Sequence, residues 1–312
     1  MGAGFWILIG VLAFIFLVIA PFAVMSGIIY FTLLVKNRPD KWGRACSAPD
    51  DPVAVAMFEE GMEWAKEHGE ARHEVQITNE GYRLWGEFFD FGSKKAVIII
   101  SGRTESLLYS YYFAEPYRRA GYSVLVTDLR AHGNSDGKVN SLGFREYRDT
   151  IAWAEFISRE FGVEKIVLHG ICIGASNAMM AITSDRCPDC VAGIVTEGMF
   201  TTFCESFRNH MIKDGHPLFP FVQFVMLWTL IVSRADAVHD GPVKRIKKLK
   251  KPILMLQSLE DEFSKPDKAG LLYDLCQSEK KIVYFDHGEH SRIRPVNREK
   301  FDETIIDFLS KL

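Results

Sequence analysis

Short apolar runs that alternate with helical patterns are the feature that most constrains the fold of this 312-residue chain. Most of the runs are continuously apolar, which is typical of strands buried on both faces of a sheet. Two runs near the start of the series alternate in polarity instead. The predicted strands are Val75–Ile77, Tyr82–Phe89, Ala96–Ile100, Ser123–Val126, Ile166–Leu168, Val191–Val195, Pro252–Leu256 and Lys281–Phe285.

The segments between these strands carry helical patterns. Helices are predicted over Val53–His68, over Leu107–Arg119, from Phe144 onward and over Ala175–Ile182. In the third of these, apolar residues recur at steps of three and four, which gives one face that can pack on a sheet. The alternation predicts the α/β class, with a mostly parallel central sheet flanked by helices.

The amino-terminal segment has a different character, because Ala3–Val35 contains no charged residue. A straight helix of this length would reach roughly 49 Å, whereas the hydrocarbon core of a bilayer is about 30 Å thick. Part of it must therefore tilt, kink near Pro21 or project into the interface. A retained transmembrane anchor is favoured over a cleaved signal peptide, because no Lys or Arg precedes the run and the run is too long.

Four basic residues, Lys36, Arg38, Lys41 and Arg44, follow the anchor and none precedes it. The positive-inside bias places the carboxyl-terminal domain in the cytoplasm, although these residues could also snorkel to headgroups on either side. The predicted organisation is an anchor over residues 1–36, a linker and leading helix over 37–72, and an α/β domain over 73–312. A cap insertion is expected near residues 200–240.

Composition excludes several other classes of function. The net charge of −3 and pI near 6.3 give no electrostatic footprint for nucleic acid. Six cysteines without framework spacing fit a reducing compartment, and Cys187-Pro-Asp-Cys190 is predicted to be a loop with two thiols rather than a zinc or redox site. No cluster implies a metal or an organic cofactor.

Two further segments leave alternatives open. Pro217–Val232 is densely apolar but too short for a confident second span. It is predicted to be a buried connecting helix, a cap over an acyl-binding pocket or a surface that touches the bilayer. The basic run Lys244–Lys251 has interspersed apolar residues and is predicted to be a solvated helix, with contact to anionic lipid as the alternative.

The motif that carries chemistry is Gly170-Ile-Cys172-Ile-Gly174, between a buried strand and a helix of small residues. In such a turn the central residue is strained and exposed, and flanking glycines let neighbouring backbone approach. The N–H groups and positive dipole end of the helix favour a thiolate and an oxyanion. Cys172 is therefore the predicted nucleophile.

From about Val75 to its end, the chain resembles the α/β-hydrolase superfamily. Ser101-Gly-Arg-Thr104 looks like the His-Gly oxyanion loop of these enzymes, with Ser101 in place of the usual His. Asp128–Gly137 is similar to their D-x-R-G-x-G-x-S-x-G loop. The chain looks closest to membrane-anchored bacterial hydrolases with a short cap, related to esterases and acylaminoacyl-peptidase-like enzymes. The resemblance implies the α/β-hydrolase fold.

The resemblance also implies the order nucleophile, acid, histidine. Asp261 in QSLEDEF stands where the family has G-x-x-D, and His290 follows the last strand in DHGEHS. His290 would take the thiol proton and return it to the leaving group, while Asp261 would hold the imidazole tautomer. The backbone N–H groups of Ile173 and Arg103 would form the oxyanion hole.

Three other carboxylates are rivals to Asp261. Glu260 and Glu262 adjoin it and are expected to be solvated surface acids. Glu197, at the end of the strand from Val191, could be an acid from the strand that a minority of the superfamily uses.

Other candidate groups are expected to play lesser roles. His287 is predicted to be a surface or supporting residue, His169 to pack or hydrogen-bond locally, and His132 to shape the oxyanion region. Ser176 lies one turn after Cys172 but lacks flanking glycines.

A thiol nucleophile has an ordinary pKa of about 8.5, so a nearby histidine can generate thiolate at neutral pH. GICIG resembles the corresponding motif of dienelactone hydrolases and polyhydroxyalkanoate synthases. We predict a membrane-anchored hydrolase or acyltransferase acting on an acyl ester, thioester or lactone through an acyl-enzyme. Its partners would be a small-molecule or lipid-like acyl substrate and the bilayer. The alternative is an inactive membrane scaffold or ligand-binding protein, suggested by Ser101 and Cys172.

Overall fold

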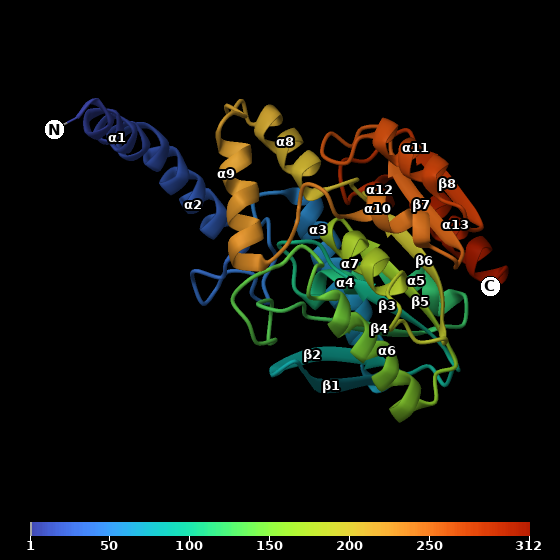
Figure 1. Ribbon diagram of the computed structural model, residues 1–312. Helices are drawn as coiled ribbons and strands as arrows, with labels where there is room; N and C mark the ends of the chain where they lie inside the picture. Colours follow the sequence, from blue (N-terminus) through green and yellow to red (C-terminus); the bar gives the residue numbers. More distant parts are fainter. Residues whose placement is uncertain (1) are drawn as a thin grey trace.

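The computed structural model describes residues 2–312 and is built around one sheet of eight strands (Figure 1). The strands lie in the order β1-β2-β4-β3-β5-β6-β7-β8. The pairs β1–β2 and β2–β4 are antiparallel, and all later pairs are parallel. The strands are β1 Arg72–Asn79, β2 Tyr82–Phe89, β3 Lys95–Ile100, β4 Ser123–Thr127, β5 Lys165–Ile171, β6 Val191–Glu197, β7 Ile253–Ser258 and β8 Lys280–Phe285. The predicted fold class is confirmed.

Helices cover both faces of the sheet, which explains why the central strands are apolar throughout. One apolar core lies between the sheet and α6, α7 and α11, and a second lies between the sheet and α3, α4, α5 and α13. The bounds are α3 Pro52–Glu67, η2 Gly69–Ala71, α4 Leu107–Ser110, η3 Tyr111–Phe113, α5 Glu115–Arg119, α6 Tyr147–Phe161, α7 Ile173–Ile182, α11 Pro266–Leu275, α12 Ile293–Val296 and α13 Arg298–Ser310.

Two predicted helices differ from the structure. The helix expected over Leu107–Arg119 is divided into α4, η3 and α5, and Pro116 lies in the first turn of α5. Proline has no N–H to donate to the preceding turn, so it starts a helix rather than continuing one. The helix expected from Phe144 begins three residues later at Tyr147, because Phe144 lies in a turn and donates its N–H to the Ser141 carbonyl.

The apolar amino-terminal segment forms one helical rod, Ala3–Leu34, long enough to cross a membrane. It consists of α1 Ala3–Phe14, the π-helical turn η1 Ile15–Ile19 and α2 Ala20–Leu34. The π-helical turn precedes Pro21, whose missing N–H disrupts the regular hydrogen-bond ladder. Residues 3–19 are exposed, whereas Ser26, Gly27 and Tyr30 are buried against the cap. The excess length of the rod is thus used in packing on the domain.

The cap is inserted between β6 and β7 and consists of α8 Phe203–Lys213, α9 Phe221–Trp228, η4 Thr229–Ser233, α10 Pro242–Arg245 and η5 Ile246–Lys248. Helix α9 lies beside α2, as Figure 1 shows. The basic run predicted to form one solvated helix instead spans the end of α10, η5 and the loop before β7. Its apolar residues Ile246 and Leu249 are buried in the core beneath the sheet, which shortens the helical segments.

Candidate active site

Cys172 lies at the carboxyl end of β5, in the turn that leads into α7. Its φ of 55° and ψ of −115° place a non-glycine residue in a strained region of backbone space. The turn is fixed because the Cys172 N–H donates to the Glu197 carbonyl at 2.9 Å and the Ala175 N–H donates to the Cys172 carbonyl at 3.0 Å. The side chain is half-buried and points to the cleft above the sheet.

The two glycines around Cys172 are required by close backbone approach. A Cβ on Gly170 would lie 2.3 Å from the Gly174 carbonyl oxygen, and a Cβ on Gly174 would lie 2.1 Å from the Ile100 carbonyl oxygen. Both contacts are with backbone, so a neighbouring side chain cannot relieve them. The glycines therefore let β5, α7 and the end of β3 converge at the cysteine.

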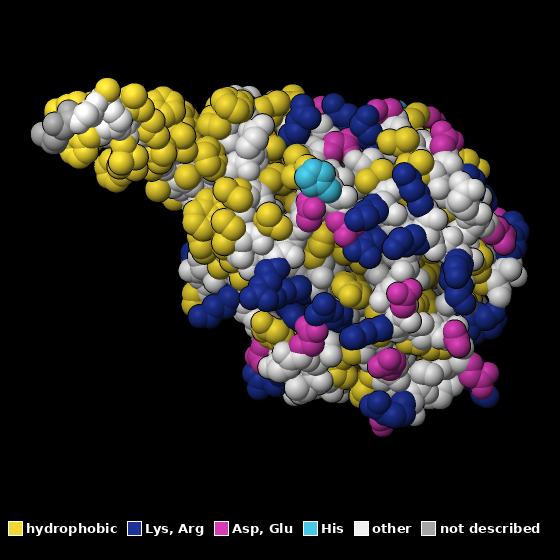
Figure 2. Space-filling view, in the orientation of Figure 1, with side chains coloured by type: hydrophobic (Ala, Val, Ile, Leu, Met, Phe, Trp, Pro, Cys, Tyr) yellow, Lys and Arg dark blue, Asp and Glu magenta, His cyan; other side chains and the backbone are white. Residues whose placement is uncertain are grey.

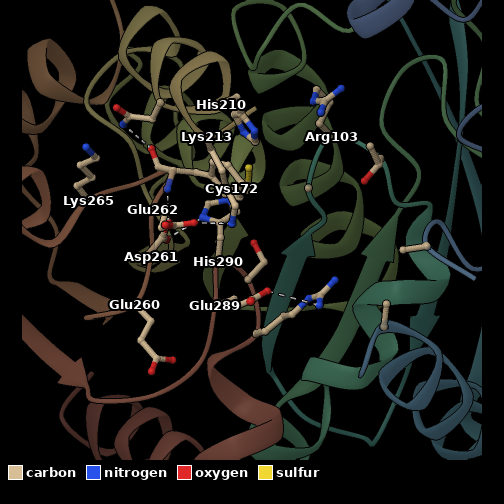
Figure 3. Close-up of a pocket in the computed structure, with 18 of the residues that line it drawn as sticks. Arg103, Cys172, His210, Lys213, Glu260, Asp261, Glu262, Lys265, Glu289 and His290 are labelled. Carbon is tan, nitrogen blue, oxygen red and sulfur yellow. Dashed lines mark hydrogen bonds and ion pairs between the residues drawn. The ribbon is translucent and has the colours of Figure 1, made fainter. Parts of the chain in front are cut away.

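His290 and Asp261 come from the loops after β8 and β7 and meet beside Cys172 (Figure 3). The His290 Nδ1 atom lies 2.7 Å from Asp261 Oδ2, and both side chains are buried. The other Asp261 oxygen, Oδ1, accepts hydrogen bonds from the N–H groups of Phe263 at 2.9 Å and Ser264 at 2.7 Å. The carboxylate is thereby held in one orientation toward the imidazole.

Electrostatics at His290 favour the imidazolium. Burial alone would lower the pKa of His290, but the neighbouring Cys172 and Asp261 side chains, and the hydrogen bond to Asp261, raise that pKa well above its usual value. The other ring nitrogen, Nε2, is buried and has no hydrogen-bond partner among residues 2–312. This arrangement brings Cys172, His290 and Asp261 together in the order in which a proton would pass between them.

The rival carboxylates occupy different environments. Glu260 is exposed, lies 3.1 Å from His287 Nδ1 and accepts the Gly288 N–H at 2.8 Å. Glu262 is exposed and pairs with Lys213 at the rim of the cleft. Neither contacts His290, because the side chains on either side of Asp261 point outward from the loop.

Glu197 is fully buried at the end of β6, below the His290–Asp261 pair. Burial raises the pKa of Glu197 to about 7, and the nearby Asp261 charge adds to that rise. Its Oε1 accepts a hydrogen bond from the Ile293 N–H at 3.3 Å, and its Oε2 has no partner among the described residues. Glu197 is therefore a buried carboxyl group close to the cleft, but the carboxylate that hydrogen-bonds His290 is that of Asp261.

The remaining predicted groups lie around the site rather than in it. His287 is exposed and faces Glu260, while His169 is fully buried between the rings of Phe113 and Tyr117. Burial lowers the pKa of His169 to about 3. Ser176 is buried and its hydroxyl donates to the Leu142 carbonyl at 3.3 Å.

The loop after β3 forms the other wall of the site. Arg103 belongs to this loop and Ile173 is the first residue of α7. Within residues 2–312, neither backbone N–H donates a hydrogen bond. Ser101 is buried, and its hydroxyl donates to the Glu105 carbonyl at 3.1 Å, which closes the loop upon itself.

The segment after the amino-terminal helix supports this loop, an arrangement that sequence patterns did not predict. His132 lies between two carbonyl oxygens, at 2.7 Å from that of Arg103 and 2.9 Å from that of Arg130. The Trp42 ring stacks on the His132 ring with 4.5 Å between centroids and 7° between planes. Trp42 itself has φ 56°, an uncommon conformation for a bulky residue. Only its isolated aromatic character in a polar linker could have drawn attention to it.

The end of the amino-terminal helix contacts the same loop. The Arg103 guanidinium donates to the Leu33 carbonyl at 3.3 Å, and the Lys41 ammonium donates to the carbonyls of Thr32 and Val35 at 2.6 Å each. These cations cap the carboxyl end of α2. Burial, together with the nearby charge of Arg103, lowers the pKa of Lys41 to about 8.

Gly198 is a second supporting residue that sequence reasoning missed. It follows β6 with φ 60°, and a Cβ there would lie 2.9 Å from His290 Cε1 and 3.0 Å from Nδ1. The absence of a side chain makes room for the imidazole. A single glycine after a predicted strand was the available signal.

A cleft of about 1140 Å³ opens above Cys172. Its walls come from α8, the loops after β3, β7 and β8, and the linker at Ser47 and Ala48. Charged side chains dominate the rim, including Arg103, Lys213 and Glu289 (Figure 3). None of the described residues 217–233 lines the cleft, so the apolar stretch of the cap does not cover it.

The two cysteines of the C-x-x-C segment lie in the loop between α7 and β6, and both are free. Burial raises the pKa of Cys187 to about 11. Across residues 2–312 there is no group of three or more His, Cys, Asp or Glu side chains that could hold a metal ion.

Comparison with known proteins gives matches to the same fold. A family model described as alpha/beta hydrolase fold matches residues 95–217. An uncharacterized protein of Bacillus subtilis is 24% identical over 218 residues, covering 69% of this chain and 71% of that protein. An uncharacterized membrane protein of Saccharomyces cerevisiae is 26% identical over 195 residues, covering 62% of each chain.

Among solved structures, an esterase of Pyrococcus furiosus superposes with a TM-score of 0.68 at 22% identity. The superposition covers 79% of this chain and 93% of the esterase. The strand order, the position of the strained turn after β5 and these matches lead to one conclusion: the chain has the α/β-hydrolase fold, preceded by an apolar helix of 32 residues.

Proposed function

We propose that this protein is a membrane-anchored hydrolase or acyltransferase that uses Cys172, His290 and Asp261 on acyl esters, thioesters or lactones. The observation that carries the proposal is the strained Cys172 turn placed against the buried His290–Asp261 pair. A protein that only binds a ligand or a partner has no need for a strained thiol beside a charge-stabilised imidazole. The esterase among the structural relatives agrees with this class of reaction.

In the proposed reaction, His290 Nε2 takes the Cys172 proton and the sulfur attacks the carbonyl carbon of the substrate. The carbonyl oxygen becomes an oxyanion that accepts hydrogen bonds from the N–H groups of Ile173 and Arg103. When the tetrahedral intermediate collapses, the bond to the leaving group breaks, and the leaving group takes the proton from His290. A thioester on Cys172 remains.

The second half of the reaction reverses these roles. Water, or another acceptor with an O–H or N–H group, gives its proton to His290 and attacks the thioester carbonyl. The Cys172 sulfur leaves and regains the proton from His290. Asp261 keeps the imidazole oriented and balances its positive charge in both halves.

The side chains that line the cleft restrict which acyl groups it can bind. The cleft is lined by charged side chains and by apolar ones such as Ile212, Leu259 and Phe263, so an acyl substrate that combines an apolar chain with a polar or charged substituent would fit it. The anchor places the site at a membrane surface, and the basic residues after the anchor favour the cytoplasmic side.

The test is turnover of a panel of p-nitrophenyl esters and acyl thioesters of increasing chain length by the full-length protein in detergent. Cys172→Ala should lower kcat by about 10⁴-fold or more, because removal of a nucleophile has effects of that order. Cys190→Ala serves as the matched control and should retain activity, since Cys190 lies in the loop before β6, away from the cleft.

Cys172→Ser should retain the fold but react slowly, because His290 would have to deprotonate a much weaker acid. If no substrate in the panel shows turnover that depends on Cys172, the inactive scaffold becomes the better description.

A further inference from the structure

An exposed apolar face runs over α2 and α9, on the side of the domain where the anchor leaves it (Figure 2). Exposed hydrophobic side chains are normal when scattered, but a continuous patch on a charged domain needs an occupant. Here Phe219 is 77% exposed and Ile231 is 60% exposed. The face, called the α2–α9 face below, consists of Val24, Met25, Ile28, Phe31, Phe219, Leu227, Leu230 and Ile231.

The two helices form one layer and run in the same direction. The Phe22 and Phe221 rings meet edge to face with 5.7 Å between centroids, and Tyr30 Oη lies 2.7 Å from Ser233 Oγ. Between these contacts, the Trp228 Nε1–H donates to the Ala23 carbonyl at 3.0 Å, and the Trp228 ring packs on Gly27. The position of α9 is therefore fixed relative to the anchor.

The apolar stretches of α2 and of α9 with η4 end side by side, at the Tyr30–Ser233 contact. Tyr30 and Ser233 are paired, and each is followed within a few residues by a cation, Lys36 after α2 and Arg234 after η4. The segment 217–233 contains no charged residue. A shared boundary between apolar and basic residues is typical of elements that enter a lipid surface together.

Helix α9 is apolar on both its buried and its exposed face. Val222, Val225 and Met226 of α9 are buried in the cap core, whereas Leu227 of α9 and Leu230 and Ile231 of the following turn η4 are exposed. The buried face attaches the helix to the domain, and the opposite face is apolar rather than polar. A helix of this kind gains free energy when its exposed face enters the headgroup and acyl boundary.

We propose that the α2–α9 face lies in the lipid–water interface of the membrane that the anchor enters, so that the domain rests on the bilayer through its cap. The lipid bilayer is the occupant because the face is continuous with the exposed apolar surface of α1 and is rigidly packed on the same helix. The inference depends on the proposed membrane anchor and is independent of the chemistry at Cys172.

The experiment uses the full-length protein in nanodiscs of phosphatidylcholine and phosphatidylglycerol. A fluorescent non-canonical amino acid is placed, in separate variants, at Ile231, at Leu227, at Leu17 in the anchor or at Val296 in α12. Val296 is the matched control, because it is 61% exposed, against 60% for Ile231, but lies away from the anchor. Quenching by spin-labelled lipids and by aqueous iodide is measured for each.

At Ile231 and Leu227 we expect strong quenching by the spin-labelled lipids and protection from iodide, while Val296 shows the opposite. The proposal is overturned if Ile231 and Leu227 are quenched by iodide as Val296 is, while Leu17 is quenched by lipid. That outcome would leave an anchor with a domain held off the membrane. Iodide quenching at Leu17 as well would show that the anchor itself is not inserted, a failure of the proposed membrane anchoring. None of these readings requires catalytic turnover.

Discussion

The two walls of the site are held in place by different parts of the molecule. On one wall, Asp261 and His290 lie in the loops that follow the neighbouring strands β7 and β8. Backbone N–H groups of the Asp261 loop hold its carboxylate in place. On the other wall, the Arg103 loop is held by a hydrogen bond between its carbonyl and His132, whose ring stacks on Trp42. The Arg103 guanidinium also donates to the Leu33 carbonyl at the end of the amino-terminal helix.

This difference separates the acid–base apparatus from the proposed oxyanion hole. The acid–base wall needs only the sheet and its loops, so it should survive changes in the anchor. The oxyanion wall depends on residues between the anchor and the domain, and it is further tied to the anchor by the Lys36 N–H, which donates to the Lys138 carbonyl at 2.7 Å. Variants on the two walls should therefore have different signatures.

The largest effect is expected on the acid–base wall. Asp261→Asn should lower kcat by about 10⁴-fold, as in other triads where an amide selects the wrong imidazole tautomer. The fold should persist, because the amide oxygen can still accept from the backbone N–H groups of Phe263 and Ser264. Steady-state kinetics together with circular dichroism in detergent would measure both properties.

Glu260→Gln is the matched control for Asp261→Asn, since Glu260 is the preceding residue but is exposed and faces His287. Its kcat should change little. Equal loss of activity in both variants would mean that Asp261 acts through loop structure and not through His290.

The sequence predicted the acid–base wall much better than the oxyanion wall, for a physical reason. Asp261 and His290 follow directly after buried strands, and the carboxyl ends of parallel strands meet at one edge of a sheet, so local patterns were enough to place them. Trp42 stacks on His132, ninety residues further along the chain, from a linker without periodicity. Such a contact depends on tertiary packing and leaves no local pattern.

The boundaries of elements show the same limit. All eight strands were predicted because each is a continuous or alternating apolar run, and α6, the helix predicted from Phe144, was misplaced only at its start. The cap was the least predictable region. Three interpretations of 217–232 remained open in the sequence. The structure excludes a cap over the cleft, because none of these described residues lines it, and contact with the bilayer stays a proposal. The position of the segment depends on contacts with α2, about two hundred residues earlier in the chain.

A second, smaller effect concerns the ionisation of the buried Glu197 and its contribution to the free energy of unfolding. Because burial raises the pKa of Glu197 to about 7, the native state holds a proton there that the unfolded chain releases near pH 4.5. Stability should therefore fall as pH rises from about 4.5 to 7 and remain low above that. Glu197→Gln removes the ionisation and should gain roughly 3 kcal/mol at pH 8, with little gain near pH 4.

Denaturant unfolding of both proteins across this pH range measures the gain. Glu262→Gln is the control, because Glu262 is an exposed acid on the cleft rim and its loss should leave the pH dependence unchanged. A parallel pH dependence in Glu197→Gln and the parent protein would contradict the assignment. The group that titrates over this range would then lie elsewhere.

The smallest effect is expected on the oxyanion wall. Trp42→Ala removes the ring that holds His132 against the Arg103 carbonyl, so the loop should shift by a fraction of an ångström and kcat should fall about tenfold. KM should change little, because the oxyanion hydrogen bonds form mainly in the transition state. The pH profile should be that of the parent protein, since the His290–Asp261 pair is untouched.

Trp42→Phe separates positioning from stability. A smaller ring can still stack on His132, so this variant should recover most of the lost kcat. Both variants should keep the fold because Trp42 belongs to neither of the two apolar cores that enclose the sheet. An unaltered kcat in Trp42→Ala would show that the oxyanion wall stands without the anchor segment. A shifted pH profile would show that the two walls are coupled. Either result would remove the distinction between a wall built by the sheet and a wall built by the anchor.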